Sequence, residues 1–196
     1  MKRKLVFATN NPHKLNEIKN ILNDRYDLVS LKDLNIIEDI PEDYNSIDEN
    51  AARKALFIYN KYKIDCFADD TGLEIGALNG EPGVYSARYA GDQCNFENNI
   101  KKVLRKLQGV KNRKARFRTV ISLVENGHIV NFEGSINGKI INQKRGIHGF
   151  GYDPIFQPDG YKQTFAEMTL DEKNKISHRA KAIEKLANYL FGKNEI

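Results

Sequence analysis

Two adjacent carboxylates, Asp69 and Asp70, are the side chains of this sequence best placed to do chemistry. They follow the apolar run 64–68 and precede Thr71 and Gly72, which predicts a strand running into a polar turn. Neighbouring carboxylates repel each other unless a cation or a shared proton relieves the repulsion. Their oxygens suit Mg²⁺, and one carboxylate can instead act as a general base on water. A cap on the next segment would need only one of the two, so the pair favours a functional role.

A second candidate is a run of hydrogen-bond donors and turn formers: Thr9, Asn10, Asn11, Pro12, His13 and Lys14. It is predicted where a strand ends and a helix begins. The N–H groups of a helix N-terminus bind anions, and the Thr, Asn and Lys side chains add donors. Asn and Pro also cap helices and form turns, so this segment alone fits an anion site and a plain turn equally well.

A third candidate places glycines around aromatic rings: Gly149, Phe150, Gly151, Tyr152, Asp153 and Pro154. Glycine lets the backbone approach a planar ligand, on which Phe150 or Tyr152 would stack. Asp153 would then read the edge of a base. The alternative is a tight turn that carries core aromatics.

A fourth candidate lies in the C-terminal helix predicted over 170–191. On one helix Lys173 and Ser177 share a face, with His178 and Arg179 beside it. A Lys and an Arg so placed can clamp phosphates. Taken alone, these residues fit a solvated helix face better.

The elements that must position these residues can be read from periodicity. Strands are predicted at 4–9, 27–31, 64–68, 115–124 and 128–136, with a strand or bend at 73–78 and a short strand at 154–157 inside a long loop. Helices are predicted at 13–23, 49–62, 95–108 and 170–191, the last entered through a capping box of Thr169 and Glu172. Asn126-Gly127 predicts a hairpin between two of the strands. The sum is a single α/β domain, residues 1–196, with a mixed sheet.

Composition excludes several classes of protein. With 196 residues, 40% hydrophobic and 29% charged, the chain is long enough and apolar enough to fold as one globular domain. No apolar run reaches the roughly 20 residues that cross a bilayer, and the apolar stretch 5–8 is too short for a signal peptide. The spacing of Cys66 and Cys94 matches no metal or redox motif. We therefore expect a cytoplasmic protein.

The net charge of +5 comes from one segment. Residues 101–118 hold nine Lys or Arg and no acid, whereas residues 33–49 hold seven acids and no base. The basic segment is interpreted as a solvated helix face followed by a strand. The alternative is a polyanion-binding surface, and with it a non-catalytic nucleotide or nucleic-acid binding module.

Six short motifs carry a family resemblance, and they stand in order along nearly the whole chain: T-N-N-P-H-K at 9–14, E-N-A-A-R-K-A at 49–55, A-D-D-T-G-L at 68–73, P-G-V-Y-S-A-R at 82–88, F-G-Y-D-P at 150–154 and S-H-R at 177–179. Together they resemble the inosine triphosphate pyrophosphatase family, also called Ham1-like or XTP/dITP diphosphatases. The resemblance implies an elongated α/β domain with a long mixed sheet flanked by helices, and two lobes with a cleft. It also implies Mg²⁺-dependent hydrolysis of ITP, dITP and XTP to the monophosphate and pyrophosphate. A cytoplasmic homodimer without a nucleic-acid or membrane partner is expected.

The same resemblance implies a role for each candidate. Asp70 would be general base and, with Glu42, metal ligand, while Asp69 would lie behind it. A purine nucleoside triphosphate would be bound by the segment 9–14 and by Lys54, Thr71, Phe150, Gly151, Tyr152, Asp153, Lys173, Ser177, His178 and Arg179. Within this set Thr9, Asn11, Lys14 and Lys54 would hold phosphates, Phe150 would stack on the base, and His178 and Arg179 would read its 6-oxo edge. Asn10 stands where many relatives have Gly. A related pocket for modified pyrimidine or methylated nucleotides is an alternative.

Overall fold

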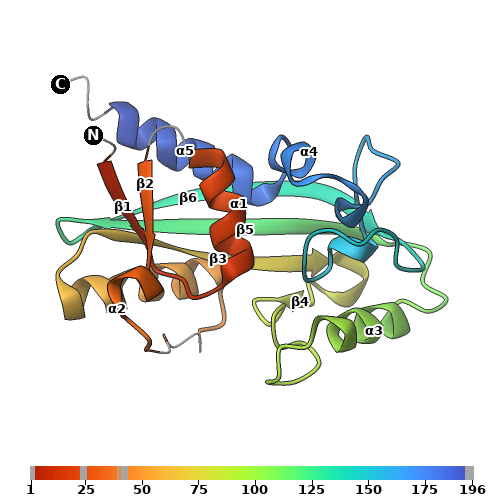
Figure 1. Cartoon of the computed structure of the whole chain (residues 1–196). Coiled ribbons are helices and arrows are strands. Elements are labelled where there is room, and N and C mark those ends of the chain that lie inside the picture. The colour runs from red at the N-terminus through yellow and green to blue at the C-terminus, as the bar shows by residue number, and fades with distance from the viewer. Residues whose placement is uncertain (1–2, 23–25, 39, 41–43, 193–196) are drawn as a thin grey trace. The chain divides into compact units, whose positions relative to one another are not determined.

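A computed structural model describes residues 3–22, 26–38, 40 and 44–192 of the chain (Figure 1). The strands are β1 (Arg3–Phe7), β2 (Tyr26–Ser30), β3 (Cys66–Ile75), β4 (Pro82–Gly83), β5 (Lys114–Glu125), β6 (His128–Ile140) and β7 (Phe156–Pro158). The α-helices are α1 (Pro12–Leu22), α2 (Ile47–Tyr62), α3 (Phe96–Lys106), α4 (Leu170–Asn174) and α5 (His178–Gly192). Four short 3₁₀ helices lie at Lys32–Leu34, Gly76–Leu78, Asp153–Ile155 and Phe165–Glu167. None of these helices is long and apolar enough to cross a membrane.

The strands form one mixed sheet in the order β2-β1-β3-β5-β6-β7, with β4 paired to β3. β1 runs parallel to both β2 and β3, while β3 with β4 and β6 with β7 are antiparallel. The predicted hairpin joins β5 to β6, and Asn126 and Gly127 both have positive φ, as a two-residue turn of this kind requires. The predicted α/β class with a mixed sheet flanked by helices is confirmed.

The chain forms two compact units. Unit 1 contains Met1–Asp70, Thr119–Gly134 and Arg179–Ile196, and unit 2 contains Thr71–Arg118 and Ser135–His178. The chain therefore passes from one unit to the other after Asp70 and again after His178.

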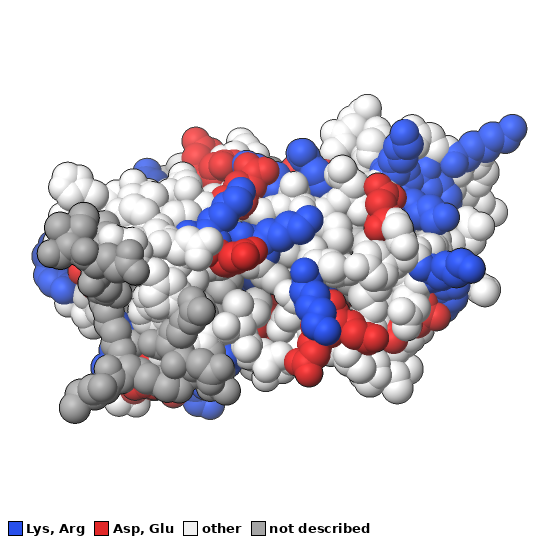
Figure 2. Space-filling model, turned by 90° about the horizontal axis from the view of Figure 1, so that it is seen from above, with Lys and Arg blue, Asp and Glu red and all other residues white. Residues whose placement is uncertain are grey.

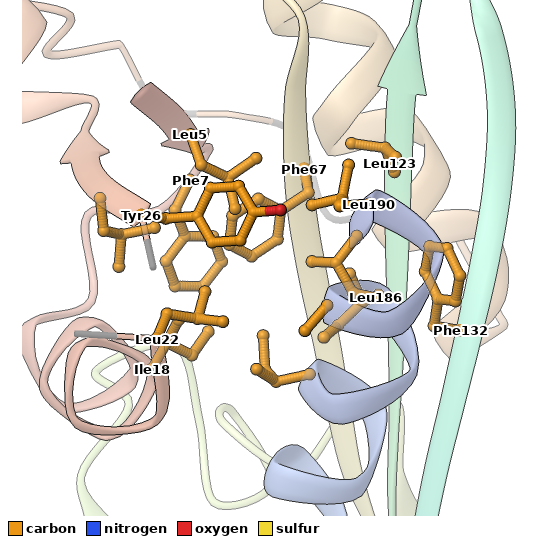
Figure 3. Packing of buried hydrophobic residues seen from close by; sticks show 14 of the residues in the cluster. Leu5, Phe7, Ile18, Leu22, Tyr26, Phe67, Leu123, Phe132, Leu186 and Leu190 are labelled. Carbon is orange, nitrogen blue, oxygen red and sulfur yellow. The ribbon is translucent and has the colours of Figure 1, made fainter. Parts of the chain in front are cut away.

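Unit 1 is built by the two-residue alternation of its strands. Leu5 and Phe7 of β1 point into a core with α1 and α5, whereas Val6 and Ala8 point into a second core with α2. The helices accordingly cover opposite faces of these strands (Figure 1). Phe7 stacks on Phe67 of β3 with 4.6 Å between the ring centroids (Figure 3). The same alternation along β3 places neighbouring side chains such as Asp69 and Asp70 on opposite faces of the strand.

Unit 2 has its own aromatic core. Phe117 of β5 packs edge-on against Phe156 of β7 at 4.7 Å, and Phe165 lies against both rings. Gly138 of β6 lets these elements approach, because a Cβ there would lie 2.4 Å from the Gln157 carbonyl oxygen.

The turn predicted after residue 68 is wrong. Residues 66–75 form one continuous strand, β3, with Asp69, Asp70, Thr71 and Gly72 inside it. A strand can carry this polar stretch because adjacent side chains point to opposite faces, so the two carboxylates do not share one environment.

The single helix predicted over 170–191 is also wrong. The capping box of Thr169 and Glu172 starts α4 as expected, but α4 ends at Asn174 and α5 begins at His178. Short i to i+3 bonds, such as Ile176 N to the Lys173 carbonyl at 3.1 Å, close the last turn of α4. Lys173 and Ser177 therefore do not share a helix face.

Candidate active site

Asp70 faces α2 and is held by Lys54. The Lys54 ammonium donates to Asp70 Oδ1 over 3.1 Å, and both side chains are buried. Asp70 follows Ala68 on the side of β3 that packs against α2, as the alternation requires. Lys54 therefore pairs with the carboxylate to which the family resemblance gives the role of general base.

Asp69 faces the opposite way and lies between α1 and α5. Lys14 donates to its Oδ1 over 2.8 Å, and Arg179 Nε donates to its Oδ2 over 3.2 Å. The Arg179 guanidinium also donates to Glu17, and the side chains of Arg179, Asp69 and Glu17 are all almost fully buried. We refer to Lys14, Glu17, Asp69 and Arg179 as the α1–α5 charge cluster.

The charge cluster lowers the pKa of Asp69. Burial alone would raise this pKa, but the positive charges of Lys14 and Arg179 outweigh burial and hold it below the ordinary value. Asp69 therefore stays ionised and serves as the counter-ion of two cations.

The segment 9–14 forms the entry of α1. Asn11 Oδ1 accepts from the backbone N–H groups of His13 and Lys14 at 2.9 and 3.3 Å, so it caps the helix. Asn11 N donates to Thr9 Oγ1 at 3.2 Å. Pro12 fills the first helical position, which has no need of an N–H donor. The capping interpretation therefore holds for Asn11 and Pro12, whereas the Lys14 ammonium is directed at β3.

In unit 2 the two aromatic residues of the segment 149–154 differ in burial. Phe150 is half-buried, whereas Tyr152 is buried in the core and its hydroxyl donates to the Ser86 carbonyl over 2.8 Å. Of the two rings, Phe150 is therefore the one with surface for a planar ligand.

A buried ion pair between Asp153 and Lys173 holds this segment in place. Asp153 Oδ2 accepts from Phe150 N at 2.9 Å and from the Lys173 ammonium at 2.6 Å, and both charged side chains are buried. The same ammonium lies 5.1 Å from the Phe150 ring centroid. Asp153 thus holds the backbone of Phe150, and Lys173 links α4 to Asp153.

Gly149 makes this arrangement possible, and Gly149→Ala is expected to disrupt it. Its φ is +73°, and a Cβ would lie 2.1 Å from Asp153 Oδ2. Left-handed backbone costs a non-glycine residue about 1–2 kcal/mol, and overpacking adds about 1–3 kcal/mol. We expect the thermal midpoint to fall by roughly 5–15 °C.

The matched control for this prediction is Gly160→Ala. Gly160 has a φ of +83° but open space where its Cβ would stand. Only the backbone penalty applies there, so the thermal midpoint should fall by several degrees less. Equal falls in the two variants would contradict the proposed collision with Asp153.

His178 and Ser177 end unit 2 at the start of α5. The His178 ring stacks on Phe117 with 4.6 Å between centroids and an interplanar angle of 10°. Both Ser177 and His178 are buried. The stacking fixes the imidazole plane, which a residue that reads one edge of a base requires.

Of the two predicted magnesium ligands, Asp70 and Glu42, the described structure includes only Asp70, and its chemistry fits the ion. Lys54 uses one oxygen of Asp70, and a carboxylate has a second that can ligate a hard cation. Glu42 lies outside the described residues. Among those described, no group of three or more His, Cys, Asp or Glu gathers as a metal cage. Mg²⁺ typically binds through one or two carboxylates together with phosphates and water, so Asp70 suits this ion better than one that needs a protein cage.

Several basic residues of the segment 101–118 have partners within unit 2. Lys106 pairs with Glu81 at 2.5 Å, Arg116 pairs with Glu74, and Arg113 donates to the Leu107 carbonyl. Figure 2 shows basic and acidic side chains beside one another at several places on one face of the molecule. The alternative of a nucleic-acid binding module is not supported.

Comparison with known proteins decides the family. A sequence model described as the Ham1 family matches residues 5–189. The dITP/XTP pyrophosphatase of Christiangramia forsetii is 54% identical over 95% of this chain and 98% of its own, and that of Flavobacterium johnsoniae is 51% identical over 95% and 97%. The structure of the Staphylococcus aureus Ham1 protein superposes with a TM-score of 0.88 at 40% identity, over 97% of this chain and all of the other.

The chain belongs to the Ham1 family. The match covers every candidate residue from Thr9 to Arg179, so all six motifs lie inside the Ham1 region. Sequence reasoning missed Glu17, which binds Arg179. The signal for it was a carboxylate three residues after Lys14 and beside buried Ile18, since a charge on a buried helix face needs a partner.

Proposed function

We propose that this chain hydrolyses ITP, dITP and XTP to the nucleoside monophosphate and pyrophosphate, removing non-canonical purines from the nucleotide pool. The observation that carries the proposal is similarity over almost the full chain, at about half of all positions, to enzymes named dITP/XTP pyrophosphatases. The buried Lys54–Asp70 pair supports it from the geometry.

The carboxylates of β3 and the lysines beside them suit the reaction at the phosphates. Asp70 would take a proton from the water that attacks the α-phosphorus, and Lys14 and Lys54 would offset charge on the departing pyrophosphate. Both lysines already stand at carboxylates of β3, so their ammonium groups are fixed before substrate arrives. Thr9 and Asn11 would add donors at the entry of α1.

The family resemblance also assigns residues to the base. Phe150 would stack on the purine, Gly151 would let the backbone approach it, and Lys173 would neutralise phosphate or contact the base. His178, joined in sequence to Arg179, would donate to the 6-oxo oxygen. The 6-amino group of adenine would leave such a buried donor unpaired, which costs about 1–3 kcal/mol.

We also propose Mg²⁺ as the cofactor, with Asp70 and Glu42 as its ligands. The ion would neutralise phosphate oxygens and lower the pKa of a bound water. The donor chemistry of Asp70 supports this. From the family resemblance we further propose a homodimer in the cytoplasm, which acts on free nucleotides without a nucleic-acid partner.

The test is pyrophosphate release in the presence of Mg²⁺ from ITP and XTP, with ATP and GTP measured in parallel. We expect release from ITP and XTP to be roughly tenfold to hundredfold faster than from ATP for each donor to the 6-oxo oxygen, which ATP lacks. GTP has the same 6-oxo oxygen, so its rate tests whether the 2-amino group is excluded as well. EDTA in excess over Mg²⁺ should abolish release. Equal rates on all four nucleotides would contradict the base discrimination, and no release from any would contradict the function.

A further inference from the structure

We propose that Phe96, the first residue of α3, is a positioning residue for the base: it holds the Phe150 ring in the orientation that stacks. This inference rests on the proposed function, in which Phe150 receives the purine. The two ring centroids lie 6.1 Å apart with an interplanar angle of 48°, a tilted geometry within the favourable range for aromatic pairs.

The backbone of Phe96 is held in place by the first turn of α3. Asn95 caps α3 by accepting from Asn98 N at 3.0 Å. Asn99, one turn into the helix and buried, donates to the Ala87 carbonyl at 2.8 Å and accepts from Ala90 N at 2.7 Å. The first turn of α3 is therefore fixed to the loop that precedes it, so the backbone of Phe96 cannot move away without breaking these bonds.

The same helix turn is also tied to the chain that leads into Phe150. Glu97 accepts from Lys144 over 2.6 Å, and Lys144 lies six residues before Phe150. α3 thus contacts this segment through an exposed ion pair and through an aromatic pair. The ion pair is exposed, so we assign most of the orienting effect to the ring contact.

Two other contacts of Phe150 do not set the plane of its ring. Asp153 fixes the Phe150 backbone N–H, and Lys173 attracts the ring without defining its plane. A neighbouring ring at fixed distance and tilt does define a plane, because aromatic pairs have preferred angles. Phe96 is 37% exposed and so is not needed to fill the core of unit 2.

The experiment measures the binding of IMP and of pyrophosphate separately, together with kcat and KM for ITP. For Phe96→Ala we expect the Kd of IMP and the KM of ITP to rise about two- to tenfold, which is the contribution of one aromatic pair. The Kd of pyrophosphate and kcat should stay within twofold. Phe96→Tyr keeps the ring and should restore IMP binding.

Two further variants make the result decisive. Tyr161→Ala removes another exposed aromatic ring of unit 2 and should leave IMP binding unchanged. Phe150→Ala should weaken IMP binding more than Phe96→Ala does.

If Phe150→Ala weakens IMP binding and Phe96→Ala does not, the role proposed for Phe96 is wrong while the proposed function stands. If Phe150→Ala has no effect, the stacking assignment fails and the inference fails with it. Equal weakening of IMP and pyrophosphate by Phe96→Ala would indicate a general structural defect and would also overturn it.

Discussion

Replacing Asp70 by Asn is expected to lower kcat for ITP hydrolysis by about 10²- to 10⁴-fold, with KM changed only a few-fold. The amide has the shape of the carboxylate but cannot accept the proton of the attacking water, and it is a poor ligand for Mg²⁺. The assay is pyrophosphate release under saturating ITP and Mg²⁺.

Loss of activity must be separated from loss of fold, because Asp70 is also the buried partner of Lys54. Asp70→Asn leaves that ammonium without its counter-charge, whereas the pair of changes Lys54→Met and Asp70→Asn removes both charges. We expect the double variant to recover most of the stability and to remain inactive. An Asp70→Asn enzyme that turns over within threefold of wild type would exclude Asp70 as the base.

Local sequence patterns predicted most of unit 1. An apolar run followed by Asn11-Pro12 gave β1 and α1, because the strand signal, the cap and the first helical residue are neighbours in the chain. The hairpin at Asn126-Gly127 was predicted for the same reason. Where adjacent residues alone determine the backbone, sequence is sufficient.

The course of β3 could not be predicted because its partners are remote. Asp69 and Asp70 look like turn residues until their counter-ions are known, and these come from Lys54, 16 residues away, Lys14, 55 away, and Arg179, 110 away. Only the fold brings these cations to the strand. The break between α4 and α5 was missed for another reason: no Gly or Pro marks residues 175–177.

The α1–α5 charge cluster is where we expect the largest effect on stability. Arg179→Met would remove the guanidinium that pairs with both buried carboxylates, Glu17 and Asp69, while Asp69 would keep its pair with Lys14. Removing one partner of a buried ion pair costs about 3–5 kcal/mol. For a chain of this length the thermal midpoint should fall by roughly 6–20 °C.

The matched control is Arg116→Met, which removes an arginine from an exposed pair with Glu74. Exposed pairs typically contribute about 0–1 kcal/mol, so this variant should unfold close to wild type. An equal loss of stability in both variants would mean that burial of the cluster has no energetic consequence.

The dependence of this loss on pH identifies its cause. In the wild type the lowered pKa of Asp69 contributes stability that is present above the unfolded value of about 3.9 and is lost only as pH falls through the lower folded value. In Arg179→Met one of the three cations that lower the Asp69 pKa (Lys14, Arg179 and Lys54) is gone, and burial raises this pKa. The variant can then protonate Asp69 as pH falls, which relieves the charge that Arg179 no longer balances.

We therefore expect urea unfolding to show a smaller difference in the free energy of unfolding between wild type and variant at pH 4 than at pH 7. A gap that stayed constant over this range would mean that lost packing around the arginine, and not the buried carboxylates, destabilises the variant.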